Sequence, residues 1–260
     1  MATRIFIDGA AGTTGLEIHQ RLKDRSEFDL IVLDDARRKD EAARRDALHE
    51  ADVAILCLPD DAARDSVALA QGSNTRIIDA SSAHRVADGW TYGFPELTGH
   101  NAVANAQFVS NPGCYPTGFL ALVAPLVEAE LLPADWPYTV NAVSGYSGGG
   151  KALIERFETE GDIAIRSYGL DLAHKHRPEM KRHAGLKHEV LFAPAVVPAY
   201  RGMLVEVPLH LGAMATNPSA ADLKAALIQR YADCPVVSVR MGAPPVELVL
   251  RRAQPAHDGM

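Results

Sequence analysis

Cys114 stands in a setting that suits a nucleophilic thiol. It lies in the segment Ser-Asn-Pro-Gly-Cys-Tyr-Pro-Thr at residues 110–117, between a strand-like run at 107–109 and an apolar helical run at 118–127. A cysteine at a helix N-terminus meets unpaired N–H groups and the positive end of the helix dipole, which favour the thiolate below the free-thiol pKa of about 8.5. We therefore predict that Cys114 is an activated nucleophile, with a buried structural cysteine as the alternative.

The other two cysteines have settings typical of packing. Cys57 lies inside the apolar run at residues 53–58, and Cys234 precedes Pro235 in a late loop. Three cysteines are an odd number, and a chain of 260 residues does not need disulfides to hold a core. We therefore expect the thiols to be reduced.

Two histidines could supply the base that a thiol nucleophile normally requires. His174 and His176 lie in the run His-Lys-His-Arg-Pro-Glu-Met at residues 174–180, where Glu179 could orient one imidazole. A zinc site is a second interpretation, but neither CxxC nor HExxH accompanies the pair, so we predict no metal. Taken alone, the segment would equally suit a solvated basic turn.

A glycine-rich loop near the N-terminus suits a dinucleotide. The run Gly-Ala-Ala-Gly-Thr-Thr-Gly at residues 9–15 follows a predicted strand and precedes a predicted helix that begins near Leu16. Glycine lets the backbone approach a pyrophosphate, and the N–H groups at the start of the helix attract its charge. A purely structural strand-to-helix turn is the alternative. The predicted cofactor-binding residues of this loop are Gly9, Gly12, Thr13, Thr14 and Gly15.

The end of the second predicted strand carries residues of both charge signs. Asp34 and Asp35 could bind a ribose 2′-hydroxyl, which would favour NAD. Arg37 and Arg38 could pair with a 2′-phosphate, which would favour NADP. We predict NADP(H) as the cofactor on the strength of the two arginines, although a solvated charge run before a helix would look the same.

Helices and strands must position these residues. The spacing of apolar residues, which predicts those elements, differs between the first hundred residues and the rest of the chain. The first hundred residues alternate short apolar runs with helical patterns, as strands covered by helices on both faces do. Predicted strands lie at residues 4–8, 30–33, 53–58 and 76–79, and predicted helices at 16–23, 40–50 and 61–71. Later come longer strand-like runs at 139–144, 189–194 and 204–211, a glycine-rich turn at 144–151 and a helical segment at 219–231.

This pattern predicts two domains of the α/β class. Residues 1–116 should form a Rossmann-like, doubly wound parallel sheet that binds NADP. Residues 117–250 should form an α+β domain with antiparallel strands for catalysis, substrate binding and dimerisation. Residues 251–260 show no periodicity and should be an unstructured tail.

The composition excludes several kinds of partner. The net charge is −7 and the pI is near 5.8, so the chain lacks the basic face that nucleic acids and anionic membranes attract. No apolar run approaches the roughly 20 residues that a membrane span requires, and the first residues read as a strand rather than a signal peptide. We expect a cytoplasmic protein that binds small molecules and assembles into a homo-oligomer.

Four of these segments together resemble one enzyme family. The loop at residues 9–15, the cysteine segment at 110–117, the turn at 144–151 and the histidine run at 174–180 resemble, in order and spacing, the shorter subfamily of N-acetyl-gamma-glutamyl-phosphate reductases. The resemblance extends to about Leu250, and Asn-Pro-Gly-Cys-Tyr-Pro-Thr is its specific part. The glycine loop is shared with many oxidoreductases.

The resemblance implies a reaction and a set of roles. In this family a cysteine attacks an acyl phosphate, phosphate leaves, and NADPH reduces the resulting thioester to N-acetylglutamate semialdehyde in arginine biosynthesis. Cys114 would be that nucleophile. His174 would be the general acid or base, with Glu179 supporting it and Tyr168 nearby, while His176 remains a rival.

The glycine-rich turn suits an anionic group of the substrate, because backbone N–H groups and cations would converge there. A phosphate or a carboxylate would fit equally. The predicted substrate-binding residues are Ser144, Gly145, Ser147, Gly148, Lys151 and Arg177.

The end of the chain departs from the family, which continues with a strand and a helix that help to form the cofactor pocket. We expect the loss of that segment to expose apolar surface and to weaken NADP binding. Two alternatives therefore stay open. One is an enzyme like aspartate-semialdehyde dehydrogenase that acts on another acyl phosphate, and the other is a non-catalytic relative that binds a dinucleotide.

Overall fold

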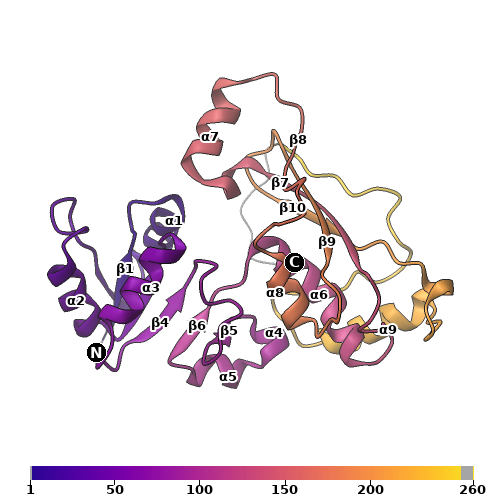
Figure 1. Ribbon diagram of the computed structural model, residues 1–260, viewed down its shortest axis with the longest axis horizontal. Helices are drawn as coiled ribbons and strands as arrows, with labels where there is room; N and C mark the ends of the chain where they lie inside the picture. Colours follow the sequence, from indigo (N-terminus) through magenta and orange to yellow (C-terminus); the bar gives the residue numbers. More distant parts are fainter. Residues whose placement is uncertain (1, 253–259) are drawn as a thin grey trace. The chain divides into compact units, whose positions relative to one another are not determined.

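The computed structural model describes residues 2–252 and Met260, and it divides into two compact units (Figure 1). Unit 1 is Met1–Pro112 and unit 2 is Gly113–Met260. The division falls four residues before the boundary after Pro116 that the sequence suggested. The reason is local, because the helix after the cysteine segment already begins at Cys114 and packs within unit 2.

Unit 1 is a six-stranded sheet with helices, as predicted. The strand order is β2-β1-β3-β4-β6-β5, and every neighbouring pair runs parallel. The strands are β1 (Thr3–Asp8), β2 (Phe28–Ile31), β3 (Val53–Leu56), β4 (Arg76–Asp79), β5 (Thr91–Tyr92) and β6 (Phe108–Ser110). The helices are α1 (Thr13–Leu22), α2 (Glu41–Glu50), α3 (Asp60–Leu69), α4 (Pro95–Thr98) and α5 (His100–Asn105).

The core of unit 1 explains why its strands could be predicted from apolar runs in the sequence. Helices α2 and α3 pack against each other and with the sheet around Phe6, Leu48, Leu56 and Ile77, whose side chains are at most 1% exposed. A strand buried in this way needs a continuous apolar run rather than an alternating one. Because all strands are parallel, their carboxyl ends meet at one edge, where ligands of such sheets bind.

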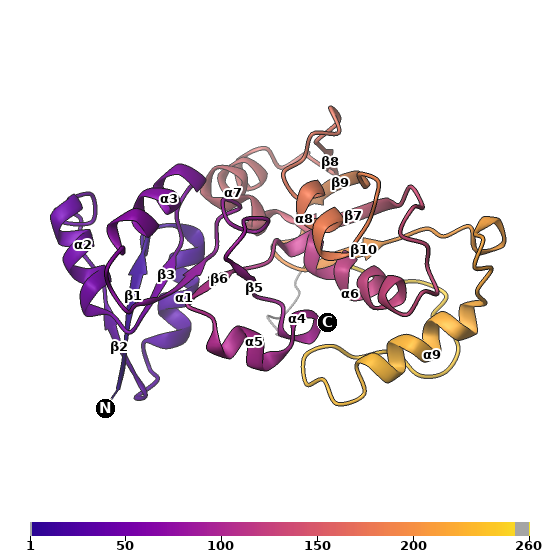
Figure 2. The same ribbon diagram turned by 60° about the horizontal axis from the view of Figure 1, so that its bottom comes forward.

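Unit 2 is a four-stranded sheet in the order β10-β7-β9-β8, with helices that include α6, α8 and α9 (Figure 2). Its strands are β7 (Thr139–Gly145), β8 (Arg166–Ser167), β9 (Leu191–Val197) and β10 (Met203–Glu206). Its α-helices are α6 (Cys114–Glu128), α7 (Gly150–Thr159), α8 (Arg177–His183) and α9 (Ala220–Arg230), and its short 3₁₀ helices are η1 (Tyr146–Gly149) and η2 (Leu211–Ala213).

Strand direction in unit 2 differs from the prediction. The pairs β10–β7 and β8–β9 are antiparallel, but the central pair β7–β9 is parallel. The prediction of antiparallel strands was therefore wrong for the central pair. Parallel neighbours require a long crossover, and here the chain between them contains η1, α7, β8 and α8.

Two local predictions in unit 2 also need correction. Helix α7 follows directly on the glycine-rich turn, where only a turn was expected. Strand β10 ends at Glu206 rather than near residue 211. The apolar run at residues 246–250 forms no strand, and Val246 is fully exposed. The predicted tail at 251–260 lies largely outside the described residues. Within the part of the chain that is described, no helix combines the length and the apolar character needed to cross a bilayer.

Candidate active site

Cys114 lies at a helix N-terminus, as predicted, but it is itself the first residue of α6, which begins four residues before the predicted start at residue 118. Gly113 before it has extended geometry, with φ −69° and ψ 149°, and acts as the N-cap residue without a side-chain cap. The Cys114 side chain is exposed. A thiol in this place meets the N–H groups at the positive end of a 15-residue helix, a setting that favours the thiolate.

The other cysteines differ in their surroundings. Cys57 and Cys234 are both half-buried. Burial raises the pKa of the Cys57 thiol to about 11, and the nearby carboxylates of Asp8 and Asp79 add to the rise. Cys57 is therefore a thiol at neutral pH, which agrees with the packing role that its apolar run suggested.

Glu179 holds the backbone directly before Cys114. It lies in the first turn of α8, is 1% exposed, and its Oε1 accepts a hydrogen bond from the Gly113 N–H at 2.7 Å. The sequence analysis had linked Glu179 only to an imidazole. The carboxylate also fixes the turn from which α6, and therefore the Cys114 thiol, begins.

The two histidines lie together but differ in exposure. Their ring centroids are 4.6 Å apart, and the backbone N–H of His176 donates to Nδ1 of His174 at 3.2 Å. His176 is buried at 7% exposure, whereas His174 is half-buried. Because Nδ1 of His174 accepts a hydrogen bond, the neutral ring carries its proton on Nε2. Burial lowers the pKa of His174, the positive charge of Lys175 lowers it further, and Asp171 opposes both.

Two tyrosines complete this cluster. The Tyr115 hydroxyl donates to Ser144 Oγ at 2.7 Å and lies 3.2 Å from the Ala195 carbonyl oxygen. Tyr168 packs edge-on against His174 at 5.5 Å. Burial raises the pKa of both tyrosines, and a negative charge on Cys114 adds to each rise. Unit 2 thus brings together the predicted catalytic side chains Cys114, Tyr168, His174, His176 and Glu179.

The glycine-rich turn does not present its first N–H groups to a ligand. Those of Gly145, Tyr146 and Ser147 donate to the carbonyl groups of Gly202, Ala199 and Tyr200 at 2.9–3.0 Å. A Cβ on Gly145 would lie 2.6 Å from the Ala199 carbonyl oxygen, so this glycine serves the close approach of two chain segments. The expected convergence of backbone donors on an anion was therefore wrong for the first part of the turn. Gly148 and Lys151 remain in open or exposed positions.

Arg177 is engaged in contacts within unit 2. Its guanidinium donates to the carbonyl groups of Leu172 and Val190, the latter at 2.8 Å, and it lies 3.9 Å from Glu189. These contacts join the start of α8 to the segments on either side of it. They favour a role in holding that segment over the predicted contact with substrate.

In unit 1 the glycine loop fits a dinucleotide. Gly9 has φ +89°, and a Cβ there would overlap the Cys57 carbonyl, while a Cβ on Gly15 would overlap the Gly9 carbonyl. A Cβ on Gly12 would lie 3.4 Å from the Gly9 carbonyl oxygen, which is ordinary van der Waals contact. Gly12 is the N-cap of α1 and carries no side-chain cap. The loop is therefore compact on its inner side and offers bare backbone at a helix start, as a pyrophosphate requires.

The two arginines after β2 pair with their own neighbours. Arg37 Nε lies 3.3 Å from Asp34 Oδ2, and Arg38 Nε lies 2.7 Å from Asp35 Oδ1, all four being well exposed. The backbone N–H of Arg37 lowers the pKa of Asp34. Exposed pairs of this kind are weak, so a phosphate could displace the carboxylates from both arginines.

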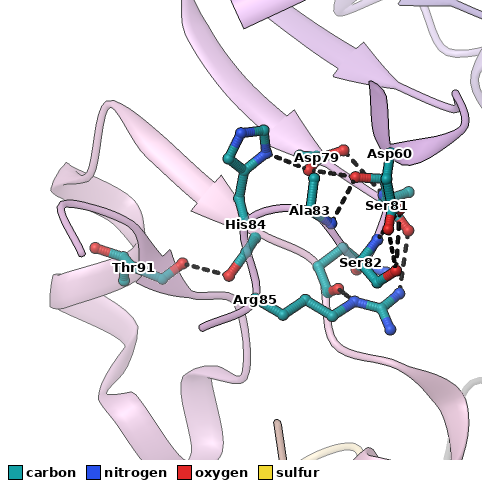
Figure 3. Close-up of polar contacts among 11 residues, drawn as sticks. Asp60, Asp79, Ser81, Ser82, Ala83, His84, Arg85 and Thr91 are labelled. Carbon is teal, nitrogen blue, oxygen red and sulfur yellow. Dashed lines mark hydrogen bonds and ion pairs between the residues drawn. The ribbon is translucent and has the colours of Figure 1, made fainter. Parts of the chain in front are cut away.

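Sequence reasoning missed a polar network at the carboxyl end of β4, which Figure 3 shows. Asp79 is fully buried and accepts hydrogen bonds from Ser81 Oγ at 2.7 Å and from His84 Nδ1 at 2.6 Å. Arg85 donates to the carbonyl groups of Ala80 and Asn111, and so ties this loop to the segment that leads towards the cysteine. The available signal was a dense polar run directly after an apolar strand.

Among the described residues, no group of three or more histidine, cysteine, aspartate or glutamate side chains is arranged to hold a metal ion. The clustered histidines instead contact aromatic rings, namely Tyr115, Tyr168 and Phe192.

Two family descriptions match this chain along most of its length. Residues 4–106 match the NAD binding domain of semialdehyde dehydrogenases, and residues 114–253 match their dimerisation domain. Curated relatives narrow the family further. A Trichormus variabilis N-acetyl-gamma-glutamyl-phosphate reductase is 50% identical over 238 residues, which is 88% of this chain and 74% of the relative. A Pseudomonas putida N-acetyl-gamma-glutamyl-phosphate reductase 2 is 51% identical over 87% of this chain and 74% of its own length.

The chain belongs to the N-acetyl-gamma-glutamyl-phosphate reductases.

Solved structures agree with this family in fold. Aspartate semialdehyde dehydrogenase II from Vibrio cholerae superposes with a TM-score of 0.65 at 15% identity, covering 95% of this chain and 84% of that one. The Candida albicans aspartate semialdehyde dehydrogenase, solved with NADP, gives 0.58 at 16% identity, covering 86% and 76%. As a member of the reductase family, the chain is an NADP-dependent oxidoreductase with a Rossmann-like domain.

Proposed function

We propose that this chain reduces N-acetylglutamyl phosphate to N-acetylglutamate semialdehyde and phosphate, through a thioester on Cys114. The observation that carries the proposal is the exposed thiol at the start of α6, with Glu179 behind its backbone and His174 and Tyr168 in the same cluster. The curated relatives that are named for this reaction support it.

The cluster can perform the acyl transfer with its own groups. The Cys114 thiolate forms a bond to the acyl carbon, the bond from that carbon to the phosphate oxygen breaks, and phosphate leaves with the electron pair. NADPH, when bound, would supply the hydride that reduces the thioester carbon. The C–S bond then breaks, so that the aldehyde leaves and the thiolate is restored.

His174 is the residue best placed to move a proton in these steps. Its Nδ1 accepts the N–H of His176, so the proton on Nε2 is available for a hydrogen bond to the substrate oxygen as negative charge develops there. His176 is buried among aromatic rings and orients His174 through its backbone. These contacts support His174 rather than His176 as the residue that acts on the substrate.

We propose that binding is divided between the units. In unit 1, Gly9, Gly12, Thr13, Thr14 and Gly15 hold the pyrophosphate, and Arg37 and Arg38 hold the 2′-phosphate. In unit 2, Lys151, Ser147 and Gly148 remain candidates for an anionic group of the substrate. Ser144 serves this site indirectly, because its hydroxyl is bonded to Tyr115.

A single comparison of substrates tests the proposed reaction. NADPH oxidation should be faster with N-acetylglutamyl phosphate than with aspartyl phosphate, and a preference for aspartyl phosphate would overturn the assignment. NADP binding without turnover on either substrate would identify a non-catalytic relative. The reverse assay with the semialdehyde, phosphate and NADP tests substrate, cofactor and competence together.

We also propose that the chain acts in the cytoplasm as a homo-oligomer. The match of unit 2 to a dimerisation domain supports the assembly. Light scattering coupled to size exclusion should give a mass that is a multiple of 28.0 kDa, and a monomer at all concentrations would contradict it.

A further inference from the structure

A buried carboxylate lies directly before the dinucleotide loop. Asp8 is the last residue of β1, is 3% exposed, and is joined by a peptide bond to Gly9. A negative charge at this point opposes the loop's task, because the loop must attract a pyrophosphate. In a low-dielectric interior, such a charge acts over a longer range than it would in water.

One arginine neutralises this carboxylate. Arg44 of α2 donates to Asp8 Oδ2 through Nε at 3.2 Å and through Nη2 at 3.0 Å, and its side chain is 14% exposed. Ser66 of α3, which is fully buried, accepts from Arg44 Nη2 and donates to the same Asp8 oxygen, both at 2.5 Å. Three elements of unit 1 therefore meet at Asp8 Oδ2.

A buried ion pair of this kind seldom adds stability over an apolar packing of the same volume. What it does provide is a defined arrangement, because each partner is penalised when the other is absent. The backbone around Asp8 is fixed as well, since its carbonyl accepts the N–H of Cys57 and Gly9 packs against the Cys57 carbonyl. The charge of Arg44 is thus placed at the rigid base of the loop.

We propose that Arg44 is a positioning residue for the cofactor, acting as the counter-charge that keeps Asp8 from repelling the pyrophosphate. The proposal rests on the proposed function, because it assumes that the glycine loop binds NADP(H). Arg44 acts through Asp8 and the loop, so its loss should weaken cofactor binding and leave the thiol chemistry of unit 2 unchanged.

The neighbouring Arg45 offers a matched control. It lies on the same helix and pairs with Glu41 at 3.0 Å, but both side chains are more than half exposed. Exposed pairs at this helical spacing contribute little. Arg45→Gln therefore removes the same charge from the same helix without baring a buried carboxylate.

The test is a direct titration of NADPH, followed by the fluorescence of the bound nicotinamide. Arg44→Gln should raise the Kd for NADPH about tenfold or more, because it leaves a buried charge without its partner. Arg45→Gln should bind like the unaltered protein. The double variant Asp8→Asn with Arg44→Gln should recover most of the lost affinity, since it removes the repelling charge together with its counter-charge.

Two further readouts separate this role from a loss of folding. The rate at which iodoacetamide alkylates Cys114 should be the same in all variants, and the KM for NADPH should rise in Arg44→Gln while kcat changes little. If Arg44→Gln does not fold, Arg44→Lys serves instead, and it should bind NADPH within about threefold of the unaltered chain because it keeps a positive charge beside Asp8.

The outcomes distinguish the proposal from the function on which it rests. An unaltered protein that binds no NADPH overturns both. Normal NADPH binding by the unaltered protein and by Arg44→Gln overturns the role of Arg44 alone. So does a double variant that binds as weakly as Arg44→Gln, or a folded Arg44→Lys that has lost binding.

Discussion

The two units build their sites in opposite ways. In unit 1 the proposed cofactor loop depends on glycines that have no side chain, because a Cβ at Gly9 or Gly15 would overlap neighbouring backbone. In unit 2 the proposed catalytic cluster depends on particular side chains, from Cys114 on one helix to Glu179 on another. A site made of bare backbone is specified by a short run of sequence, whereas a site made of side chains is specified by distant contacts.

The largest expected effect is the loss of turnover when the thiol of unit 2 is replaced, with NADPH binding by unit 1 unchanged. Cys114→Ser should abolish reduction of N-acetylglutamyl phosphate, because a serine hydroxyl at neutral pH is a far weaker nucleophile than a thiolate. NADPH should bind with unchanged affinity in a fluorescence titration. Cys57→Ser is the control and should retain turnover. Turnover by Cys114→Ser would show that the thiol is not the nucleophile.

A change in the cofactor loop should have the reverse effect. Gly9→Ala should abolish NADPH binding, because alanine at φ +89° is strained and its Cβ overlaps the Cys57 carbonyl. Gly72→Ala has a similar φ of +85° but open space around it, so it should cost about 1 kcal/mol of stability and leave NADPH binding unchanged. Equal losses of NADPH binding in Gly9→Ala and Gly72→Ala would mean that the strain of a positive φ, rather than the contact with the Cys57 carbonyl, causes the loss.

A smaller effect is expected where unit 2 uses a side chain to hold backbone. Glu179→Ala should lower the free energy of unfolding by about 2 kcal/mol, since it leaves the buried Gly113 N–H without its acceptor. Glu179→Gln keeps an oxygen acceptor and should lose less. Glu160→Ala breaks an exposed pair with Arg156 and should stay within about 0.5 kcal/mol in urea unfolding. A Glu179→Ala loss as small as that of Glu160→Ala would show that the Glu179 carboxylate does not stabilise the backbone at Gly113.

The smallest expected effect is a shift in a pH profile. Burial and Lys175 lower the pKa of His174 from 6.5, so the imidazole stays neutral to a lower pH than a free histidine does. The acid limb of kcat/KM should therefore lie below pH 6.5 and move in a His174→Gln variant.

The same lowered pKa makes the free energy of unfolding depend on pH. Between the lowered pKa and 6.5 the unfolded chain binds more protons, so stability falls as pH falls through this window. An acid limb at or above pH 6.5 would contradict the assignment of His174.

The parts of the fold that the sequence predicted are those with a local signal. The strands of unit 1 are short apolar runs because helices cover them, and α6 was anticipated from its apolar run after Cys114. Helix α7 was missed because its first residues continue a glycine run. The parallel direction of β7 and β9 was missed because it depends on the crossover between them, which no period in the strands records.

In the candidate site, too, the features that could be predicted are those with a local signal in the sequence. The thiol, the histidines and the glycine loop could be predicted from residue type and from the elements on either side. The contacts from Glu179 to Gly113 and from Arg44 to Asp8 join positions 66 and 36 residues apart, and no short motif encodes such distances. The same limit explains why the N–H groups of the turn were assigned to a ligand, although the segment at residues 199–202 accepts them.

The contact between Glu179 and Gly113 also sets an order for the synthesis of the protein. The two residues are 66 positions apart, so a nascent chain leaving the ribosome exposes the cysteine segment well before the carboxylate that completes its turn exists. Cys114 is therefore synthesised before the residue that holds the backbone next to it. A chain arrested before α8 carries the Cys114 segment without the carboxylate that accepts the Gly113 N–H.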